Sequence, residues 1–219
     1  MVTSFRLALV VHLVAAAIAA AVPAAAQTLS FQQRVNAPAG SARFAHALAV
    51  DGTTMIVGAE YETEGANERQ GAAYVHTKAG TAWTQQQRLV ASDGAARDAF
   101  GYAVDINDDR LVVGAPMYVR NGNEEDSGAA YIFRRNGATW MQEAKLVPSD
   151  RIAGAEWWYG FSVKIVGTTV LVGSPSNNTT YVYTFNGTSW VEQERLRNPG
   201  GVSVSSFGHD LDISGDSAC

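Results

Sequence analysis

Hydrophobic and polar residues alternate along a stretch near the middle of the chain, from Phe100 to Pro116. Aromatic or aliphatic side chains take every second position as far as Ile106, which is the period of a β-strand. After a polar turn, Leu111 to Val113 is a continuous apolar run, typical of a strand covered on both faces. Gly114 and Pro116 then end the run. The stretch predicts a pair of antiparallel strands.

Two more strands are expected downstream, one at Ala129 to Phe133 and one from Trp140 to Val147. Asn136-Gly137 separates them, and Asn186-Gly187 has the equivalent place later in the chain. Asn-Gly tolerates positive φ at both central positions of a hairpin turn, so these dipeptides predict tight antiparallel connections.

The whole pattern recurs, with copies that begin at Phe44, Tyr159 and Phe207. Four short strands per unit of about fifty residues, without helical periodicity, predict one propeller blade per repeat. We therefore expect an all-β fold, an incomplete β-propeller of about three four-stranded antiparallel blades plus orphan terminal strands. The expected boundaries are 1–26 for a signal peptide, 27–43 for an orphan outer strand and linker, 44–99, 100–158 and 159–206 for blades 1 to 3, and 207–219 for the truncated start of a fourth blade.

Both ends of this array look unfinished. Leu29 to Val35 has the pattern of a fourth strand such as Trp83 to Leu89, and in closed propellers such an orphan strand completes the last blade. The last copy, from Phe207 to Cys219, stops partway through. Ring closure takes four to eight blades, and uncapped arrays expose apolar faces and strand edges. We expect a truncated chain.

The first 26 residues differ from the rest. Arg6 is followed by the apolar segment Leu7 to Val22 and then by small residues up to Ala26, the pattern of a secretory signal cleaved after Ala26. The alternative is a retained membrane anchor, but the apolar segment is shorter than the roughly 20 residues that a span needs. We expect no membrane span after cleavage and a secreted, cell-surface or periplasmic protein.

Charge and cysteine content narrow the possibilities further. The 219 residues carry a formal net charge of -5, without the basic stripe of a nucleic-acid-binding protein. The single cysteine, Cys219, allows no intrachain disulfide, so stability must come from packing.

Phe100-Gly101 and Gly114-Ala115-Pro116 bracket the second unit, and this unit resembles the FG-GAP repeat found in integrin alpha-chain propellers. The wider pattern, with Gly128 to Phe133 and Trp140, is similar to a bacterial branch of that family found in exported proteins. The resemblance extends from Leu29 to the C-terminus and implies a propeller. It also implies a binding or adhesion role.

Integrin-like members hold calcium in an Asp-rich loop between the first two strands. The equivalent loops here, around Asp51, Asp108 and Gly167, do not supply carboxylates at the alternating positions that calcium requires. Asp108 and Asp109 are better explained as solvated turn residues. Calcium remains possible, but we expect no cofactor.

Long loops join the second and third strands of the first two units, and such loops often carry binding surfaces. Their acidic residues could form a recognition patch or a loose cation site, or could simply be solvated. These weak candidates are Glu60, Glu62, Glu64, Glu124, Glu125 and Asp126. Trp157-Trp158-Tyr159 could offer a sugar-stacking surface, or could fill the core between blades.

Catalytic groups are not evident. His46 and His209 occupy nearly equivalent repeat positions, which indicates blade packing, and neither a nucleophile motif nor zinc spacing occurs. We expect a binding or adhesion scaffold, not an enzyme, with an extracellular protein or carbohydrate ligand. The alternatives are a fragment of an exported hydrolase, sialidase-like or with its catalytic part missing, and a non-functional remnant.

Overall fold

A computed structural model describes residues 33–38, 43–116, 128–150, 157–198, 206–214 and 217–218. The chain divides into two units, 1–31 and 32–219, and all the described residues belong to the second. The expected signal peptide and most of the orphan strand lie outside the described ranges and stay predictions. Among the described residues, no helix is long and apolar enough to cross a membrane.

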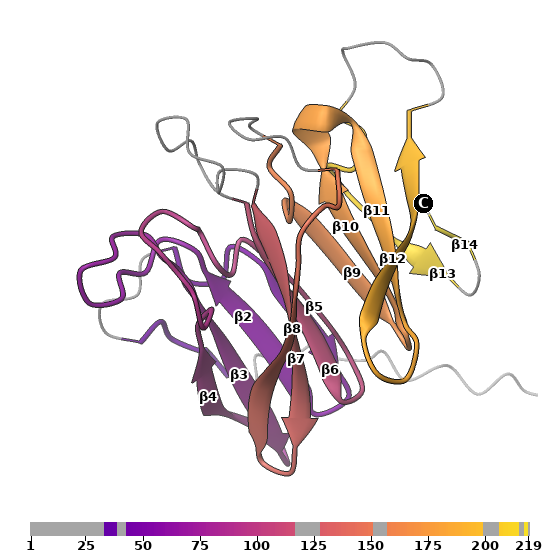
Figure 1. The fold of residues 1–219 in the computed structure, drawn as a ribbon. Helices are drawn as coiled ribbons and strands as arrows, with labels where there is room; N and C mark the ends of the chain where they lie inside the picture. Colours follow the sequence, from indigo (N-terminus) through magenta and orange to yellow (C-terminus); the bar gives the residue numbers. More distant parts are fainter. Residues whose placement is uncertain are drawn as a thin grey trace, which may run out of the picture. The chain divides into compact units, whose positions relative to one another are not determined.

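The described part of the chain consists of three four-stranded antiparallel sheets and a short hairpin, which confirms the all-β prediction (Figure 1). The strands of each sheet follow one another in chain order. Blade 1 contains β1 (Leu48–Asp51), β2 (Thr54–Ala59), β3 (Ala72–Ala79) and β4 (Ala82–Leu89). Blade 2 contains β5 (Ala103–Asn107), β6 (Arg110–Ala115), β7 (Ala129–Asn136) and β8 (Thr139–Leu146). Blade 3 contains β9 (Ser162–Val166), β10 (Thr169–Ser174), the 3-10 turn η1 (Pro175–Asn177), β11 (Thr179–Phe185) and β12 (Trp190–Arg197). The hairpin of β13 (Ile213–Ser214) and β14 (Ser217–Ala218) has the register of β5 and β6, and the sheets do not close into a ring.

The hydrophobic core lies between successive sheets because both faces of the middle strands are apolar. Ile56 and Val75 of blade 1 pack in one cluster with Leu111 and Val113 of blade 2. The opposite face of blade 2 forms a second cluster with blade 3, from residues such as Ile132 and Val172. A continuous apolar run in a middle strand therefore serves two interfaces at once.

An aromatic group inside each blade fixes the entry of its first strand. The rings of Phe100 and Tyr131 lie 5.5 Å apart, and those of Phe100 and Phe133 lie 6.0 Å apart. Blade 1 repeats this arrangement with Phe44, Tyr74 and His76, at 5.7 and 6.4 Å. His76 therefore occupies a buried aromatic position of the repeat.

The outer hairpins are tight, but their turn geometry differs from the sequence prediction. Asn136 pairs with Thr139 as the last residue of β7, so the two central turn residues are Gly137 and Ala138. Only Gly137 has positive φ, at 62°, which is the φ pattern of a type II′ turn. The prediction that Asn-Gly fills both central positions is wrong, because the glycine alone meets the conformational demand. In blade 3 the connection is longer, since Phe185 pairs with Trp190.

A β-bulge recurs in the fourth strand of all three blades, at Gln86, Glu143 and Gln193. A bulge redirects the side chain of the extra residue. Here it points toward the next blade, where Gln86 Oε1 accepts a hydrogen bond from Trp140 Nε1 at 3.4 Å and Glu143 Oε2 accepts one from Trp190 Nε1 at 3.1 Å. The recurring tryptophans thus join neighbouring blades.

The backbones of Trp140 and Trp83 each form two hydrogen bonds with a glutamine side chain that precedes the blade. The Gln87 side chain accepts from Trp140 N at 2.7 Å and donates to Trp140 O at 2.9 Å. Gln33 makes the same two contacts with Trp83, at 2.6 and 2.9 Å. Residue 33 therefore holds the place of a preceding outer strand, as the repeat pattern predicts, although residues 33–38 are not a regular strand.

The edge of blade 1 that faces no described blade exposes apolar side chains. Leu48 and Val50 of β1 are 55% and 51% exposed. Their equivalents in β5, Val104 and Ile106, are only 9% and 6% exposed, because blade 1 covers them. The difference in exposed fraction shows how much a neighbouring blade buries the side chains of a first strand.

An arginine lies at each of the two interfaces between blades, but it comes from the later blade at the first interface and from the earlier blade at the second. Between blades 1 and 2, the Arg135 guanidinium donates to the hydroxyl of Thr54, the first residue of β2. Between blades 2 and 3, Arg110, the first residue of β6, lies 4.4 Å from the Phe185 ring centroid. Each interface therefore pairs an arginine with one side chain of the facing blade, a hydroxyl group in the first case and an aromatic ring in the second.

Candidate functional site: a row of aromatic rings

The aromatic-glycine pair that opens the second and third units sets the geometry of one end of the sheets. Gly101 has a φ of 92°, and a Cβ added there would lie 2.3 Å from the Ala72 carbonyl oxygen of the preceding blade. Gly160 repeats this relationship with Ala129 at the same 2.3 Å. Only glycine allows this conformation and this approach. The residue after each of these glycines is therefore held in an equivalent place in blades 2 and 3.

The third residues of the four repeats, His46, Tyr102, Phe161 and His209, form a continuous row of rings across the repeats. Successive ring centroids lie 4.7, 4.9 and 4.6 Å apart, with tilted planes. The two histidines are exposed, and Tyr102 and Phe161 are half-buried. The row lies at the end of the sheets where the second strands end and the third strands begin, the same end as the long acidic loops. This is a surface of ring edges and faces open to solvent.

Trp158 widens the row, whereas its neighbours do not contribute to it. Its ring stacks on Phe161 with centroids 5.8 Å apart and planes 14° from parallel, and it is half-buried. Trp157 and Tyr159 are buried in the core between blades 2 and 3. The two interpretations of this aromatic triplet therefore apply to different residues of it.

The acidic loop of blade 1 holds its first two carboxylates inside the protein. Glu60 is fully buried, and its Oε1 accepts from Arg43 Nη1 at 3.1 Å. Glu62 is also buried and accepts from the Tyr74 hydroxyl at 2.6 Å and from Arg88 Nε at 2.7 Å. Glu64, which is more exposed, also bonds Arg88. Glu124, Glu125 and Asp126 lie outside the described residues.

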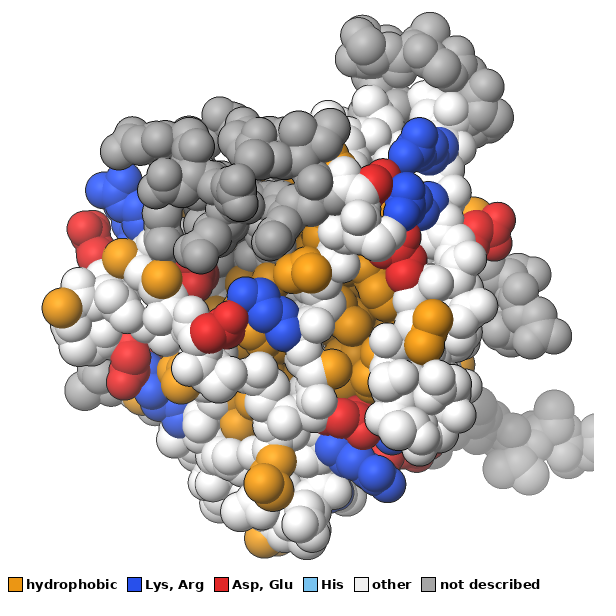
Figure 2. Space-filling model, in the orientation of Figure 1, with side chains coloured by type: hydrophobic (Ala, Val, Ile, Leu, Met, Phe, Trp, Pro, Cys, Tyr) orange, Lys and Arg blue, Asp and Glu red, His pale blue; other side chains and the backbone are white. Residues whose placement is uncertain are grey.

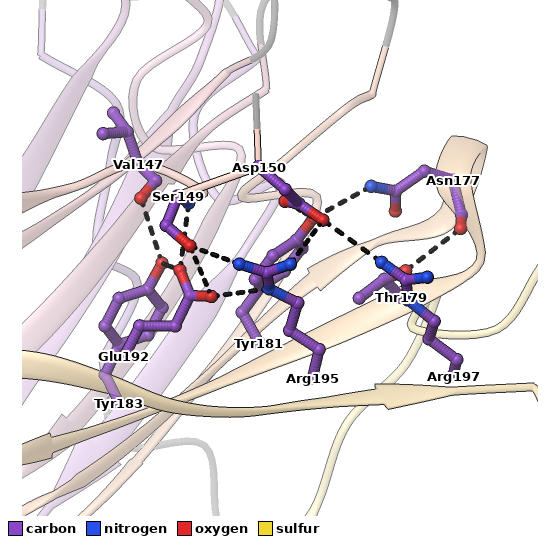
Figure 3. Close-up of polar contacts among 10 residues, drawn as sticks. All are labelled: Val147, Ser149, Asp150, Asn177, Thr179, Tyr181, Tyr183, Glu192, Arg195 and Arg197. Atoms are coloured by element: carbon purple, nitrogen blue, oxygen red, sulfur yellow. Dashed lines mark hydrogen bonds and ion pairs between the residues drawn. The ribbon is translucent and has the colours of Figure 1, made fainter. Parts of the chain in front are cut away.

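Arg88 and Tyr74 belong to a polar cluster that every blade repeats at this end. The pairs are Tyr74 with Arg88, Tyr131 with Lys145, and Tyr181 with Arg195, each directly opposite in the sheet. In blade 3, Asp150 accepts from the Tyr181 hydroxyl and from Arg195 Nη1, both at 2.9 Å (Figure 3). Asp150 follows β8, so this cluster fastens the end of blade 2 to blade 3.

Blade 2 uses Asp93, which follows β4, in the same way. Asp93 accepts from Lys145 Nζ at 2.7 Å and from the Tyr131 hydroxyl at 3.1 Å. Burial alone would raise the pKa of Asp93, but the hydrogen bonds and charge of Lys145, with the Tyr131 hydrogen bond, outweigh it and lower that pKa. The sequence position equivalent to Asp93 before blade 1 is Ala39. Glu62 and Glu64 therefore supply, from within blade 1, the carboxylate that the previous blade supplies elsewhere.

These contacts leave the cluster carboxylates and bases bound to each other. Burial and the neighbouring Glu62 carboxylate raise the pKa of Tyr74 to about 12. Charged side chains of opposite sign also lie next to each other on the face drawn in Figure 2. Among the described residues of these clusters, the arrangement neutralises charge locally and fixes the loops.

The turns that could have held calcium make protein contacts instead. Asp51 Oδ2 accepts from the backbone N–H of Asp108 in the next blade at 2.6 Å, and Asn107 Oδ1 accepts from Gly167 N at 2.6 Å. Within the described ranges, no group of three or more His, Cys, Asp or Glu residues could hold a metal ion. Asp51 thus links blades through a turn.

Comparison with known protein families agrees with this architecture. The family model of the FG-GAP repeat matches residues 33–76, 83–133 and 140–185, and the second and third matches begin in the fourth strand of the preceding blade. The chain belongs to the FG-GAP repeat family. A comparison with curated proteins finds no match.

The structure explains why the FG and GAP parts of the FG-GAP repeat occur together. A Cβ added to Gly114 of the GAP segment would lie 2.0 Å from the carbonyl oxygen of Gly160, the FG glycine of the next blade. The two motifs are therefore opposite sides of one contact between blades. Blade 1 departs from the motif, since Ala45 replaces the FG glycine and takes a φ of 67°.

Repeat alignment alone did not identify the row of rings. His46 and His209 are predicted to pack between blades, and their rings do contact Tyr102 and Phe161 of neighbouring repeats, but both histidines are also exposed. The usable signal is the third position of each unit, after Phe44-Ala45 and Phe207-Gly208, because Tyr102 and Phe161 hold the same position in blades 2 and 3. Which rings remain open to solvent depends on packing between blades, and a sequence pattern does not give that.

Proposed function

We propose that this FG-GAP protein is an exported binding scaffold, without catalysis of its own, that contacts an extracellular protein or carbohydrate through the row of rings. The single observation that carries the proposal is the continuity of the row: His46, Tyr102, Phe161 and His209 come from four successive repeats and lie ring against ring. Solvent-accessible aromatic surfaces of this kind provide contact area at low entropic cost.

Two further features support a scaffold role. The sheets pack rigidly through glycine contacts, so the rings keep fixed positions, and rigid elements make effective binding surfaces. The cluster carboxylates Glu62, Asp93 and Asp150 are engaged with tyrosine and basic side chains, which favours structural roles for them over proton transfer. The expected site of action is the cell surface, the periplasm or the medium.

The test uses the purified full-length chain on an array of immobilised polysaccharides and extracellular matrix proteins. A double variant, Tyr102→Ala with Phe161→Ala, removes the two central rings and should abolish binding to whichever array member retains the parent. Met141→Ala is the matched control, because Met141 is a large exposed apolar residue on β8, outside the row. If the double variant binds as the parent does while remaining folded, the rings are not the contact surface and the proposal fails.

A further inference from the structure

Two Asn-Gly dipeptides lie in the equivalent outer hairpins of blades 2 and 3, and both asparagines are exposed. In such a dipeptide the backbone nitrogen of glycine can attack the asparagine side-chain carbon Cγ, because glycine has no Cβ to hinder the approach. Asn136 and Asn186 have the same following residue, so their local chemistry is closely similar. What differs is how the protein holds each carboxamide.

The Asn186 side chain is tied to its own turn. Its Oδ1 accepts from the backbone N–H groups of Thr188 and Ser189, both at 2.9 Å. Its Nδ2 donates to Ser189 Oγ at 3.3 Å. Asparagine commonly bonds backbone groups two and three residues on in this way. The carboxamide must leave these contacts before Gly187 N can reach Cγ.

The Asn136 side chain makes no hydrogen bond to any residue in the described ranges. It lines a pocket of about 400 Å³ together with Arg134, Arg135, Met141, Gln142 and Glu143. Arg135 Nε is buried and has no hydrogen-bond partner among the described residues. Two arginines and Glu143 thus line a pocket with a carboxamide that forms no hydrogen bond to a described residue. Arg134 Nε also bonds Asp109 Oδ2 at 3.3 Å, and Arg135 also donates to the Thr54 hydroxyl.

We propose that Asn136 is a site of spontaneous deamidation promoted by this pocket. Gly137 N attacks Cγ and gives up its proton to a solvent base, so that negative charge develops on the Asn136 side-chain oxygen. Fixed positive charge near a developing oxyanion lowers the barrier. Protonation of the amide nitrogen releases ammonia and leaves a cyclic imide. Water then opens the imide at either carbonyl, and the product is aspartate or isoaspartate.

The modification changes charge and backbone at one hairpin. A neutral carboxamide becomes a carboxylate beside Arg134 and Arg135, which favours the ionised product. The isoaspartate form also lengthens the main chain by one carbon directly before the two-residue turn that pairs Asn136 with Thr139. The end of blade 2 would thus acquire a permanent negative charge with age.

The experiment incubates the purified full-length chain at mildly alkaline pH and follows both asparagines by peptide mapping and mass spectrometry. Asn136 should convert several-fold faster than Asn186 in the native protein. In urea the two rates should become similar, because only the fold separates them. Equal native rates, or faster conversion of Asn186, would overturn the proposal, and so would a difference that persists in urea.

The variant Arg134→Gln tests the role of the pocket charge. Arg134 is 54% exposed and forms an exposed ion pair with Asp109, so its replacement leaves the core intact. The variant should slow conversion of Asn136 and leave Asn186 unchanged, which serves as the internal control. An unchanged Asn136 rate would remove Arg134 from the mechanism and contradict the proposal that the pocket promotes the reaction.

Discussion

Gly58 of blade 1 and Gly101 of blade 2 touch backbone to backbone: a Cβ added to Gly58 would lie 1.9 Å from the Gly101 carbonyl oxygen. Neither chain segment can yield without separating the two sheets. The glycines of the repeat thus set the spacing between blades, and the large aromatic residues fill the space that this spacing leaves.

Gly58→Ala should therefore be strongly destabilising, by about 3 kcal/mol, because overpacking against rigid backbone cannot be relieved by side-chain movement. Gly80→Ala provides the comparison. Gly80 has a φ of 61° and nothing within 4 Å of an added Cβ, so this change should cost only about 1 kcal/mol of backbone strain. Urea unfolding of the two variants measures the difference. A smaller loss at Gly58 than at Gly80 would contradict the tight contact.

Ala45→Gly should stabilise the protein, by about 0.5–1 kcal/mol. Ala45 has a φ of 67°, a left-handed conformation that costs a residue with a Cβ about 1–2 kcal/mol. Glycine removes this strain, but it also increases the conformational entropy of the unfolded chain, which offsets part of the gain. Ala47→Gly, two residues on, lacks this strain and should destabilise. Thermal unfolding of both variants gives the comparison, and a parallel loss of stability in both would refute the strain at position 45.

Stability should fall as the pH drops below about 6.5, in part because of His76. Burial lowers the pKa of His76 below its usual value of 6.5 in the folded chain. Between the two pKa values the unfolded state binds a proton that the folded state does not, so acid favours unfolding, and above 6.5 the effect vanishes.

His76→Phe, the residue found at the equivalent position 133, should remove this component of the pH dependence. His46→Phe changes an exposed ring and should leave the component in place. Denaturant unfolding at several pH values between 5 and 8 tests both variants. A pH slope that survives in the His76→Phe variant would assign the effect to other groups.

Glu143 should tolerate glutamine better than alanine. Its carboxylate accepts from Arg110 at 2.9 and 3.1 Å and from Trp190 Nε1 at 3.1 Å. Glu143→Gln keeps an acceptor for the indole, as Gln86 does for Trp140, and loses the ion pair, at a cost of about 1–2 kcal/mol. Glu143→Ala loses both and should cost more. Equal losses in calorimetry would show that the indole contact contributes nothing.

The fold was predictable from sequence because each blade repeats the same local pattern. The period-two segment at Phe100 forms the first strand, the β-branched run forms the middle strand β6, and the recurring tryptophans contact the neighbouring blade. Each of these features is repeated in every unit. The repeat pattern also aligns Gln33 with Gln87, and the two side chains make the same pair of contacts, with Trp83 and Trp140.

The candidate site was less accessible to sequence reasoning, because its features depend on contacts between units. Glu62 lies in a polar loop and could have been solvated, yet it is buried, because Tyr74 and the more distant Arg88 both donate hydrogen bonds to its carboxylate. His209 packs on Phe161 as the repeat pattern predicts, but the pattern does not show that its ring is also exposed. Trp157 and Trp158 are adjacent and of the same type, but only one of them faces solvent, since successive residues point in different directions.

The side chains that face each other at the two blade interfaces are complementary only in the present order of the repeats. Arg135 on one side of blade 2 fits against Thr54, and Arg110 on its other side fits against Phe185. If blade 2 were duplicated in tandem, Arg110 of the first copy would meet Arg135 of the second, and two guanidinium groups would be forced together. Although the repeats share one sequence pattern, they are therefore not interchangeable. A changed order would place side chains of the wrong size or charge against each other at the blade interfaces.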